Sequence, residues 1–347
     1  MNTHDSYMKH CLELATKGLG CVAPNPLVGC VLVKDGKIIG EGFHEKYGEA
    51  HAEVNAINSV INKEHLKHCT LYVNLEPCAH QGKTPPCVDL IIAHKIPYVV
   101  VGCLDSNPLV NSKGVAKLIQ NGIDVKIGVL DKECRNLNKR FFTFQEKKRP
   151  YIILKWAESN DGFVAPINNK EISWITGEDS RNLVHQWRSQ EQAILIGTNT
   201  AIIDNPQLTV RNYKGNNPIR ILIDKNLRTP LSHRIFEQTA QILVFTNYKQ
   251  ASYNKVEYCT IDFEKNIIPQ VMEELYKRNI TSVLVEGGAF TLNSFIASNL
   301  WDEAKVFKGT IDFKEGVTAP KLTSNFKQNY SLTIGYDLLT AYTNYGI

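Results

Sequence analysis

The sequence lacks the features that mark several classes of protein. None of its apolar runs approaches the roughly 18 residues of a membrane-spanning helix, and its N-terminus does not have the charged and then apolar layout of a secretion signal. Neither sign of charge dominates, because 39 Lys and Arg residues against 35 Asp and Glu residues leave a formal net charge of +4. That balance speaks against a nucleic-acid partner but leaves room for a local basic pocket that binds phosphate. We therefore expect a cytoplasmic protein without a membrane or nucleic-acid partner.

Internal repeats, low-complexity tracts and a dense cysteine framework are also missing. The nine cysteines are scattered over 347 residues, which indicates reduced thiols rather than disulfides. At this length a single hydrophobic core is unusual, and with 43% hydrophobic residues the chain can build two. Helix and strand patterns alternate along both halves, which favours an α/β architecture. The charged stretch at residues 144–150 ends in proline and predicts the linker, so we expect domains at residues 1–146 and 147–347.

Local patterns place individual elements along the chain. Asp5 stands where it can cap a helix whose apolar residues recur at helical spacing. Asp35-Gly36 is typical of a hairpin turn between two strands. By the same criteria, we expect strands near residues 28–33, 37–42, 70–75, 98–102, 125–129, 151–157, 193–197, 219–224, 241–246 and 282–286, and helices near residues 51–60, 89–94, 115–121, 178–188, 267–279 and 289–298.

One group of residues in the first half has the chemistry of a zinc site. His51 and Glu53 stand at the start of a predicted helix, Cys78 follows the next predicted strand, and Cys87 lies further along. One imidazole and two thiolates suit tetrahedral zinc and leave a fourth position for water, as in catalytic sites. Zinc lowers the pKa of bound water toward about 7, and Glu53 can then carry a proton between that water and a leaving amine. This order of His-x-Glu, Pro-Cys and a second Cys is the signature of zinc deaminases.

Other interpretations of these residues stay open. A lone His-x-Glu pair is common, and two cysteines can simply be buried apolar thiols. The main alternative is a zinc nucleic-acid or nucleoside deaminase with a non-catalytic accessory domain, although such enzymes usually carry Cys-x-x-Cys. A structural zinc module joined to a ligand-sensing domain would need a fourth protein ligand, for which His80 is the candidate.

Further motifs accompany the zinc-site residues. The first half contains Pro24-Asn25-Pro26-x-Val28-Gly29, Gly42-Phe43-His44, His51-Ala52-Glu53 and Glu76-Pro77-Cys78-x-His80-x-Gly82-x-Thr84-Pro85-Pro86-Cys87. The second half contains Lys155-x-Ala157-x-Ser159-x-Asp161-Gly162, Trp174-Ile175-Thr176, Asp204-Asn205-Pro206-x-Leu208-Thr209-x-Arg211 and Val285-Glu286-Gly287-Gly288. Together these motifs resemble the bifunctional riboflavin-biosynthesis deaminase/reductase family over essentially the whole chain. The long spacing between the two cysteines distinguishes that family from other deaminases.

The resemblance implies a fold and a pair of reactions. The fold is a cytidine-deaminase-like three-layer α/β/α domain followed by a dihydrofolate-reductase-like α/β domain. The first reaction is the zinc-hydroxide hydrolytic deamination of a diaminopyrimidinone ribosylamino phosphate. The second is the NADPH-dependent reduction of the ribosyl group of the resulting aminouracil to ribityl. The implied cofactors are Zn²⁺ and NADPH, the partner is a small phosphorylated pyrimidine, and the protein is a homo-oligomer, either a dimer or a tetramer.

The resemblance also implies the residues that bind substrate and cofactor. In the deaminase half the substrate would contact Asn25, His44, Lys83 and Thr84, among which a histidine and a lysine can face a phosphate. In the reductase half the substrate would contact Arg188, Leu208, Arg211 and Glu286, with both arginines facing its phosphate. Asp204 is the candidate that polarises or protonates the sugar. NADPH would contact Ala157, Trp174, Thr200, Asp204, Gly288, Ala289, Phe290, Thr291, Leu292, Asn293 and Ser294.

The second half has no Gly-x-Gly-x-x-Gly after its first strand, so a Rossmann domain is not expected. Gly287-Gly288 instead joins a predicted strand to a predicted helix, where free N–H groups favour a diphosphate, although a tight turn alone also explains two glycines. The sequence departs from the family at Ile172, where a serine is frequent and Ser173 stands beside it. It also departs at residues 105–108 and 110–114.

Overall fold

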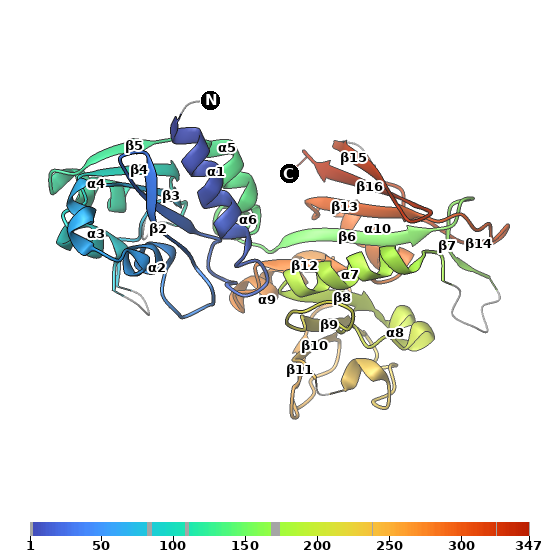
Figure 1. Cartoon of the computed structure of the whole chain (residues 1–347). Coiled ribbons are helices and arrows are strands. Elements are labelled where there is room, and N and C mark those ends of the chain that lie inside the picture. The colour runs from blue at the N-terminus through green and yellow to red at the C-terminus, as the bar shows by residue number, and fades with distance from the viewer. Residues whose placement is uncertain are drawn as a thin grey trace. The chain divides into compact units, whose positions relative to one another are not determined.

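A computed structural model describes residues 3–81, 85–107, 111–167, 174–237, 239–323 and 325–346. The chain divides into two units, Met1–Lys148 and Arg149–Ile347, each with its own sheet (Figure 1). The boundary expected from the sequence lies slightly earlier, between residues 146 and 147. No helix in the described ranges is both long enough and apolar enough to span a membrane.

The first unit is built on a five-stranded sheet with the order β2-β1-β3-β4-β5. β1 pairs antiparallel with β2 and β3, whereas β3, β4 and β5 run parallel to one another. The predicted hairpin turns at Asp35 and Gly36, whose φ angles of 50° and 73° suit an Asp-Gly turn. The strands are β1 (Gly29–Lys34), β2 (Lys37–Phe43), β3 (Thr70–Leu75), β4 (Tyr98–Cys103) and β5 (Asp124–Ile127).

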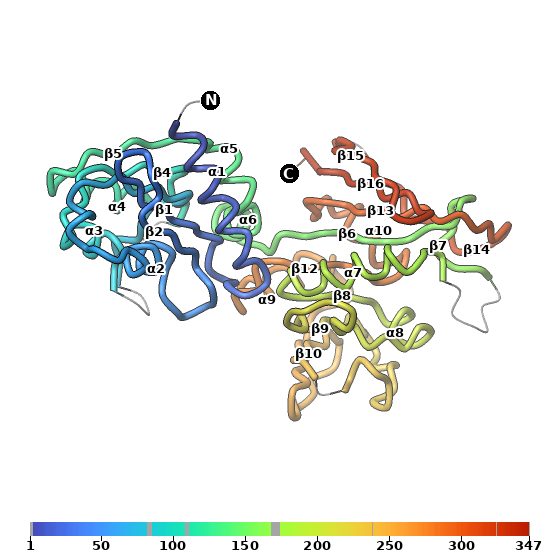
Figure 2. The backbone as a smooth tube through the Cα atoms, in the orientation of Figure 1, coloured from blue at the N-terminus to red at the C-terminus, as the bar shows by residue number. Residues whose placement is uncertain are grey.

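Helices cover both faces of this sheet, which gives the three-layer α/β/α arrangement expected for the first unit (Figure 2). Side chains alternate between the faces of a strand. Leu71 and Val73 therefore pack against α2, α3 and α4, whereas Tyr72 packs on the face covered by α1, α5 and α6. The helices are α1 (Thr3–Thr16), α2 (Ala52–Ser59), α3 (Cys87–Ala93), α4 (Lys113–Gln120), α5 (Asp131–Leu137) and α6 (Lys139–Lys147), with a 3₁₀ helix at Lys63–His68.

One expectation for the first unit is wrong, and a second holds over a shorter range of residues. The helix α1 already includes Thr3, so Asp5 lies in its first turn and does not cap it, although a carboxylate there still favours the positive end of the helix dipole. The boundary between the units at Lys148 and Arg149 falls inside the linker expected at residues 144–150, but residues 144–147 form the last turn of α6. This helix forms because Phe141, Phe142 and Phe144 bury an apolar face, while the charged Glu146 and Lys147 that follow them are exposed.

The second unit is built on a nine-stranded sheet with the order β11-β10-β9-β8-β12-β6-β13-β16-β15. The strands from β11 to β13 are parallel, and β16 and β15 continue the sheet antiparallel at one edge (Figure 1). The strands are β6 (Tyr151–Glu158), β8 (Ala193–Gly197), β9 (Ile219–Ile223), β10 (Ile242–Thr246), β11 (Val256–Thr260), β12 (Ser282–Val285), β13 (Glu303–Lys308), β15 (Phe326–Ile334) and β16 (Asp337–Asn344). β7 (Phe163–Pro166) pairs separately with β14 (Gly316–Thr318).

The parallel strands of the second unit are apolar on both faces because helices cover each face. α9 and α10 pack on one face, and α7 and α8 pack on the other. In such sheets ligands bind beyond the carboxyl ends of the parallel strands. We therefore expect a ligand-binding site at the carboxyl ends of β6, β8 and β12. The helices are α7 (Glu178–Gln190), α8 (Thr198–Asp204), α9 (Ile267–Lys277) and α10 (Ala289–Ala297), with a 3₁₀ helix at Arg234–Phe236.

Candidate zinc centre and reductase site

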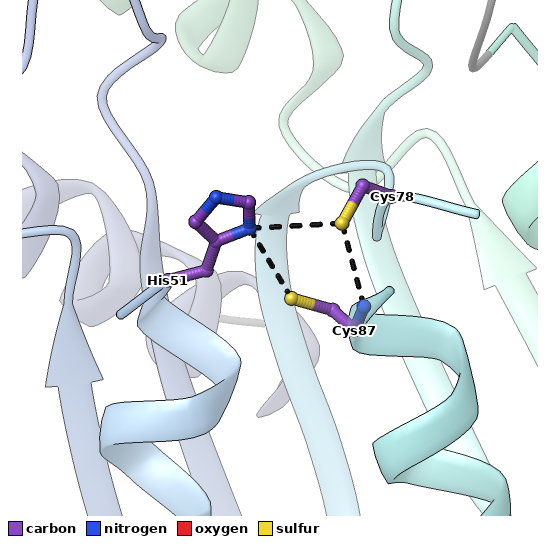
Figure 3. A group of neighbouring side chains, drawn as sticks. All are labelled: His51, Cys78 and Cys87. Carbon is purple, nitrogen blue, oxygen red and sulfur yellow. Dashed lines mark hydrogen bonds between the residues drawn. The ribbon is translucent and has the colours of Figure 1, made fainter. Parts of the chain in front are cut away.

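Three side chains meet beside the carboxyl end of β3 in the first unit. His51 directly precedes α2, Cys78 lies in the segment that follows β3, and Cys87 is the first residue of α3 (Figure 3). Their ligand atoms all lie within 4.8 Å of one another. The sequence placed these residues at the ends of separate elements, and the parallel arrangement of β3 and its neighbours brings them together.

The spacing of these atoms fits one tetrahedral zinc ion. His51 Nδ1 lies 3.6 Å from Cys78 Sγ and 3.4 Å from Cys87 Sγ. Zn–N and Zn–S bonds of ordinary length at a tetrahedral angle place nitrogen and sulfur about 3.6 Å apart. The backbone N–H of Cys87 donates to Cys78 Sγ at 3.3 Å, which suits a thiolate (Figure 3). Hydrogen bonds from Cys87 and His51 hold the pKa of Cys78 well below its usual range, so this sulfur is available as a thiolate ligand.

His80 does not join this group. In the described part of the chain, the group that could hold a metal contains His51, Cys78 and Cys87 only. The Nδ1 atom of His80 is buried and has no hydrogen-bond partner. A set of three protein ligands is typical of catalytic zinc, whereas a structural site is closed by four. The arrangement therefore gives no support to a structural zinc module.

Glu53 lies in the first turn of α2 and faces the three ligands. Its side chain is only 3% exposed and is hydrogen-bonded to Cys87. Burial and the nearby Cys78 raise the pKa of Glu53 to about 7. A carboxyl group with a pKa near neutrality can both accept and release a proton, as a general acid–base catalyst must.

Asn25 and His44 form a second layer beside the ligands. The ring of His44 meets that of His51 edge-on, with centroids 5.3 Å apart. His44 Nδ1 faces the carbonyl of Ala50 at 3.0 Å and therefore donates to it, and burial lowers the pKa of His44. Its Nε2 atom then accepts from Asn25 Nδ2 at 3.1 Å, which leaves the Oδ1 atom of Asn25 for a ligand. Both nitrogens of His44 are thus engaged within the protein, and its contact with a phosphate stays a prediction.

Some predicted positions lie outside the described residues. Lys83 and Thr84 of the deaminase half are two of them, and Ile172 and Ser173 of the reductase half are two more. The departure at residues 105–108 is described as far as Asn107. Its Asp105 is buried and accepts from the backbone N–H of Asn107 at 2.7 Å, and burial raises the pKa of Asp105 to about 6.

Glu76 is a residue whose role the sequence did not indicate. Its buried carboxylate accepts four backbone N–H groups from the segment that follows β4 and from the start of α4. An added methyl group on Gly114 would lie 2.1 Å from the carbonyl of Pro77, so this glycine allows α4 to approach the Cys78 segment. The donors to Glu76 are Asp105 at 3.3 Å, Ser112 at 3.0 Å, Gly114 at 3.0 Å and Val115 at 3.2 Å.

Replacing this carboxylate by an amide should destabilise the first unit. In Glu76→Gln the amide keeps one acceptor oxygen but turns an NH₂ group toward backbone donors. We expect a loss of about 1–3 kcal/mol in the free energy of unfolding. This loss is measured by urea unfolding, with hydrogen exchange as the probe that reports on the first unit. The matched control is Glu64→Gln, which changes an exposed carboxylate that pairs with Lys67. Equal stability of the two variants would contradict this role of Glu76.

In the second unit, charged side chains gather where β6 and β12 end. Glu286 directly follows β12 and accepts from Arg188 Nε at 2.7 Å and Arg188 Nη2 at 2.8 Å. Lys155 on β6 lies 3.9 Å from the same carboxylate. Burial opposes the charge on Glu286, but the two cations outweigh it and lower its pKa to about 2. Lys155 belonged to a predicted motif, but no role was predicted for it. A lysine within an otherwise apolar strand is the signal that could have indicated a role in the site.

Arg188 and Leu208 are less available to a ligand than expected. Arg188 donates two hydrogen bonds to Glu286 and a third to the carbonyl of Thr209 at 3.4 Å. Leu208 has a positive φ of 55°, packs its side chain into the core and is buried as a whole. Arg211 is exposed, and its backbone N–H donates to the buried His185 at 3.4 Å.

The glycine pair between β12 and α10 has a structural reason at each position. A methyl group on Gly287 would lie 2.3 Å from Ile196 Cα, so this residue lets the turn pass over the end of β8. Gly288 caps α10 with a φ of 43° and lies close to Thr200. Phe290 is 80% exposed, whereas Leu292 is buried in the core. The first turn of α10 therefore offers backbone N–H groups that can bind a diphosphate, with the exposed ring of Phe290 beside them.

The remaining predicted cofactor residues lie on different elements. Ala157 lies near the end of β6, and Thr200 and Asp204 lie on α8, with Asp204 as its last residue. Trp174 is 62% exposed, and Arg181 stacks over its ring at 4.8 Å. Thr291 is buried, while Asn293 is exposed on α10 and the hydroxyl of Ser294 donates to the Phe290 carbonyl.

Comparison with known proteins places the chain in a family. Residues 150–311 match the RibD C-terminal domain, and residues 1–103 match the cytidine and deoxycytidylate deaminase zinc-binding region. The chain is 41% identical to the riboflavin biosynthesis protein RibD of Aquifex aeolicus over 324 residues, which cover 90% of this chain and 88% of that protein. The chain belongs to the RibD family.

Further RibD proteins agree with this assignment. The Escherichia coli RibD is 39% identical over 87% of this chain and 86% of its own length. A crystal structure from Thermotoga maritima, a diaminohydroxyphosphoribosylaminopyrimidine deaminase/5-amino-6-(5-phosphoribosylamino)uracil reductase, is similar with a TM-score of 0.91 at 39% identity, over 99% of both chains. Acinetobacter baumannii RibD gives a TM-score of 0.89 at 33% identity, again over 99% of both chains.

Several predictions from the sequence are thereby confirmed. The chain is a bifunctional enzyme of the RibD family with a deaminase domain and an NADPH-dependent reductase domain. Its fold combines a cytidine-deaminase-like α/β/α domain with a RibD-type reductase domain. The cofactors are zinc for the first domain and NADPH for the second, and the His/Cys/Cys group of the first unit suits the metal.

Proposed function

We propose that this RibD-family enzyme carries out both steps on one phosphorylated pyrimidine. The first domain, residues 1–146, would deaminate a diaminohydroxyphosphoribosylaminopyrimidine, and the second, residues 147–347, would reduce the aminouracil that results. The observation that carries the proposal is the three-ligand group of His51, Cys78 and Cys87 with the buried Glu53 beside it. Full-length similarity to a protein with both of these activities supports the substrate.

The deamination replaces the amino group of the pyrimidine ring by oxygen. His51, Cys78 and Cys87 would hold the zinc, which supplies a bound water of lowered pKa when present. Glu53 would take a proton from the attacking water and deliver it to the departing amine, so that ammonia leaves and its own charge is restored. Asn25, held by His44, would accept from the pyrimidine edge through Oδ1. Lys83 and Thr84 would complete the pocket, with Lys83 toward the phosphate.

The reduction converts the ribosyl group to ribityl. When bound, NADPH would supply a hydride for C1 of the ribose in its open imine form, and the nitrogen would need a proton. Ala157, Trp174, Thr200, Asp204 and the first turns of α10 (residues 288–294) would hold the cofactor. Glu286, Arg188, Leu208 and Arg211 would hold the substrate, with Arg211 toward the phosphate. Asp204, exposed at the end of α8, would donate the proton, and partial desolvation raises its pKa in the direction that this role needs.

The proposal extends to the setting of the enzyme. All nine cysteines are free, which supports a reducing compartment such as the cytoplasm. The near-neutral balance of charge supports a small-molecule substrate without nucleic acid. Assembly into a homodimer or homotetramer rests on the family resemblance alone.

A coupled assay with metal removal tests the proposal. Purified protein should release ammonia from the phosphorylated diaminopyrimidinone, and it should oxidise NADPH only once the deaminated product has formed. We expect chelation to abolish ammonia release and zinc to restore it, whereas NADPH oxidation with the preformed aminouracil should continue without metal. Ammonia release from a protein shown to contain no metal would contradict the role of the three ligands. Absence of NADPH oxidation would contradict the second half of the proposal.

A further inference from the structure

Arg211 shares a hydrogen-bond acceptor with a second arginine that has no assigned role. The Oε1 atom of Gln207 accepts from Arg211 Nη1 at 3.1 Å and from Arg234 Nη2 at 3.1 Å. The amide nitrogen of Gln207 donates to Glu237 Oε2 at 2.6 Å. These partners fix the amide, because a flipped Gln207 would turn its NH₂ group toward two guanidinium groups.

One carboxylate lies beside the two guanidinium groups. Glu237 forms an ion pair with Arg234 at 3.8 Å, whereas in the described ranges no carboxylate pairs with Arg211. Desolvation lowers the pKa of Arg211, and the charges of Arg188 and Arg234 lower it further. Each guanidinium group donates one hydrogen bond to Gln207 Oε1 and has further N–H groups that a ligand can use. An anion with several oxygens would satisfy those donors and relieve the repulsion.

Arg234 is held in this place from both sides. On one side its backbone N–H donates to Asn205 Oδ1 at 2.7 Å, in the segment that follows α8. On the other side the fully buried Arg220 of β9 donates to the carbonyls of Ile235 and Glu237, each at 2.7 Å, and to the hydroxyl of Thr239. Burying a cation without a carboxylate is costly. Here the hydrogen bonds of the buried Arg220 fix the loop of Arg234 to the sheet.

We propose that Arg234 is a second phosphate-binding residue of the reductase site, and that Gln207 is the positioning residue that sets Arg234 and Arg211 for the same phosphate. The inference rests on the proposed function of the second domain. Arg234 would bring a guanidinium group to the phosphate, whereas Arg188 forms hydrogen bonds with Glu286. Discrimination of a phosphorylated sugar from a free one would then depend on Arg234.

The test compares variants of the full-length protein in reductase kinetics with 5-amino-6-(5-phosphoribosylamino)uracil. We expect Arg234→Ala to raise KM about tenfold, the effect of one charge-assisted hydrogen bond, with little change in kcat. Gln207→Glu should raise KM more than Gln207→Ala, because its carboxylate would pair with both arginines and repel the phosphate. Arg228→Ala removes an exposed cation from a neighbouring loop and should leave KM unchanged. Ammonia release by the first domain should stay at the wild-type rate in every variant.

A binding measurement separates this inference from the proposed function. Calorimetry with ribose 5-phosphate on NADPH-loaded protein should show weaker binding in Arg234→Ala than in wild type, and ribose should bind both equally weakly. An unchanged KM together with unchanged ribose 5-phosphate binding would overturn the role of Arg234. Equal effects of the two Gln207 substitutions would overturn the role of Gln207. If wild type binds ribose 5-phosphate through Arg234 but never oxidises NADPH, the binding site stands and the proposed reduction fails.

Discussion

Replacing Glu53 by glutamine is expected to reduce ammonia release by about 10²- to 10⁴-fold, the range that general acid–base catalysis contributes. The amide has nearly the same shape as the carboxylic acid but can neither take the proton from water nor hand it to the departing amine. Glu53 is only 3% exposed, so solvent water has little access to replace it. His51, Cys78 and Cys87 are untouched, and we expect the zinc content of the variant to equal that of wild type.

The measurement combines ammonia release with elemental analysis of the same protein sample. NADPH oxidation with the preformed aminouracil should be unchanged in Glu53→Gln, because that reaction belongs to the other domain. Glu64→Gln, an exposed carboxylate on the 3₁₀ helix of the first unit, should behave as wild type in both assays. A variant that keeps its zinc and still deaminates at more than a tenth of the wild-type rate would show that Glu53 is not the proton carrier.

The residues of the zinc centre could be predicted because metal chemistry demands particular side chains. An imidazole and two thiolates with prolines beside them are rare enough to stand out in the sequence, and strand and helix patterns place them at the ends of elements. The role of Glu76 could not be predicted in the same way. Its partners are backbone N–H groups from residues 105–115. Because nearly every residue has a backbone N–H group, the sequence does not show which of them will donate to Glu76.

The fold was predictable where apolar residues recur with a clear period. β3 and β8 were expected with the bounds that the structure gives them, since both are short buried runs. The opposite holds for α6, whose phenylalanines are flanked by five charged or amide residues, so that its composition resembles that of a solvated linker. β15 was not expected either, and most of its residues are exposed, although the alternation of apolar and polar side chains over residues 330–334 is a signal that could have indicated it.

The contacts of the reductase site depend on charge pairing that the sequence does not specify. Arg188 and Glu286 were both assigned to the substrate, and the structure joins them to each other at 2.7 Å and 2.8 Å. A motif shows which residues are present but not which of them neutralise one another. The same limit applies to Leu208, which was assigned to the substrate but has a positive φ and a side chain buried in the core.

The pair formed by Glu286 and Arg188 gives the second large expected effect. In Glu286→Gln the buried Arg188 and Lys155 lose their only nearby negative charge in the described part of the chain, and we expect the second unit to lose about 3–5 kcal/mol of its free energy of unfolding. Reductase turnover should fall with it, whereas ammonia release should not change. Glu264→Gln, an exposed carboxylate paired with Lys225, is the matched control and should unfold as wild type does.

The difference in unfolding free energy between wild type and Glu286→Gln should depend on pH, which provides an independent check. Glu286 has its pKa lowered from the ordinary 4.5 to about 2 by Arg188 and Lys155. The stabilisation from its charge is therefore fully present above about pH 4.5 and is lost as the pH falls toward 2. Glutamine cannot ionise, so the gap in unfolding free energy between wild type and Glu286→Gln should be constant from pH 7 to 5 and narrow below that. Urea titrations of the second unit at pH 7, 5 and 3 measure it. A gap of the same size at pH 3 as at pH 7 would show that the stabilisation does not come from the charge of Glu286.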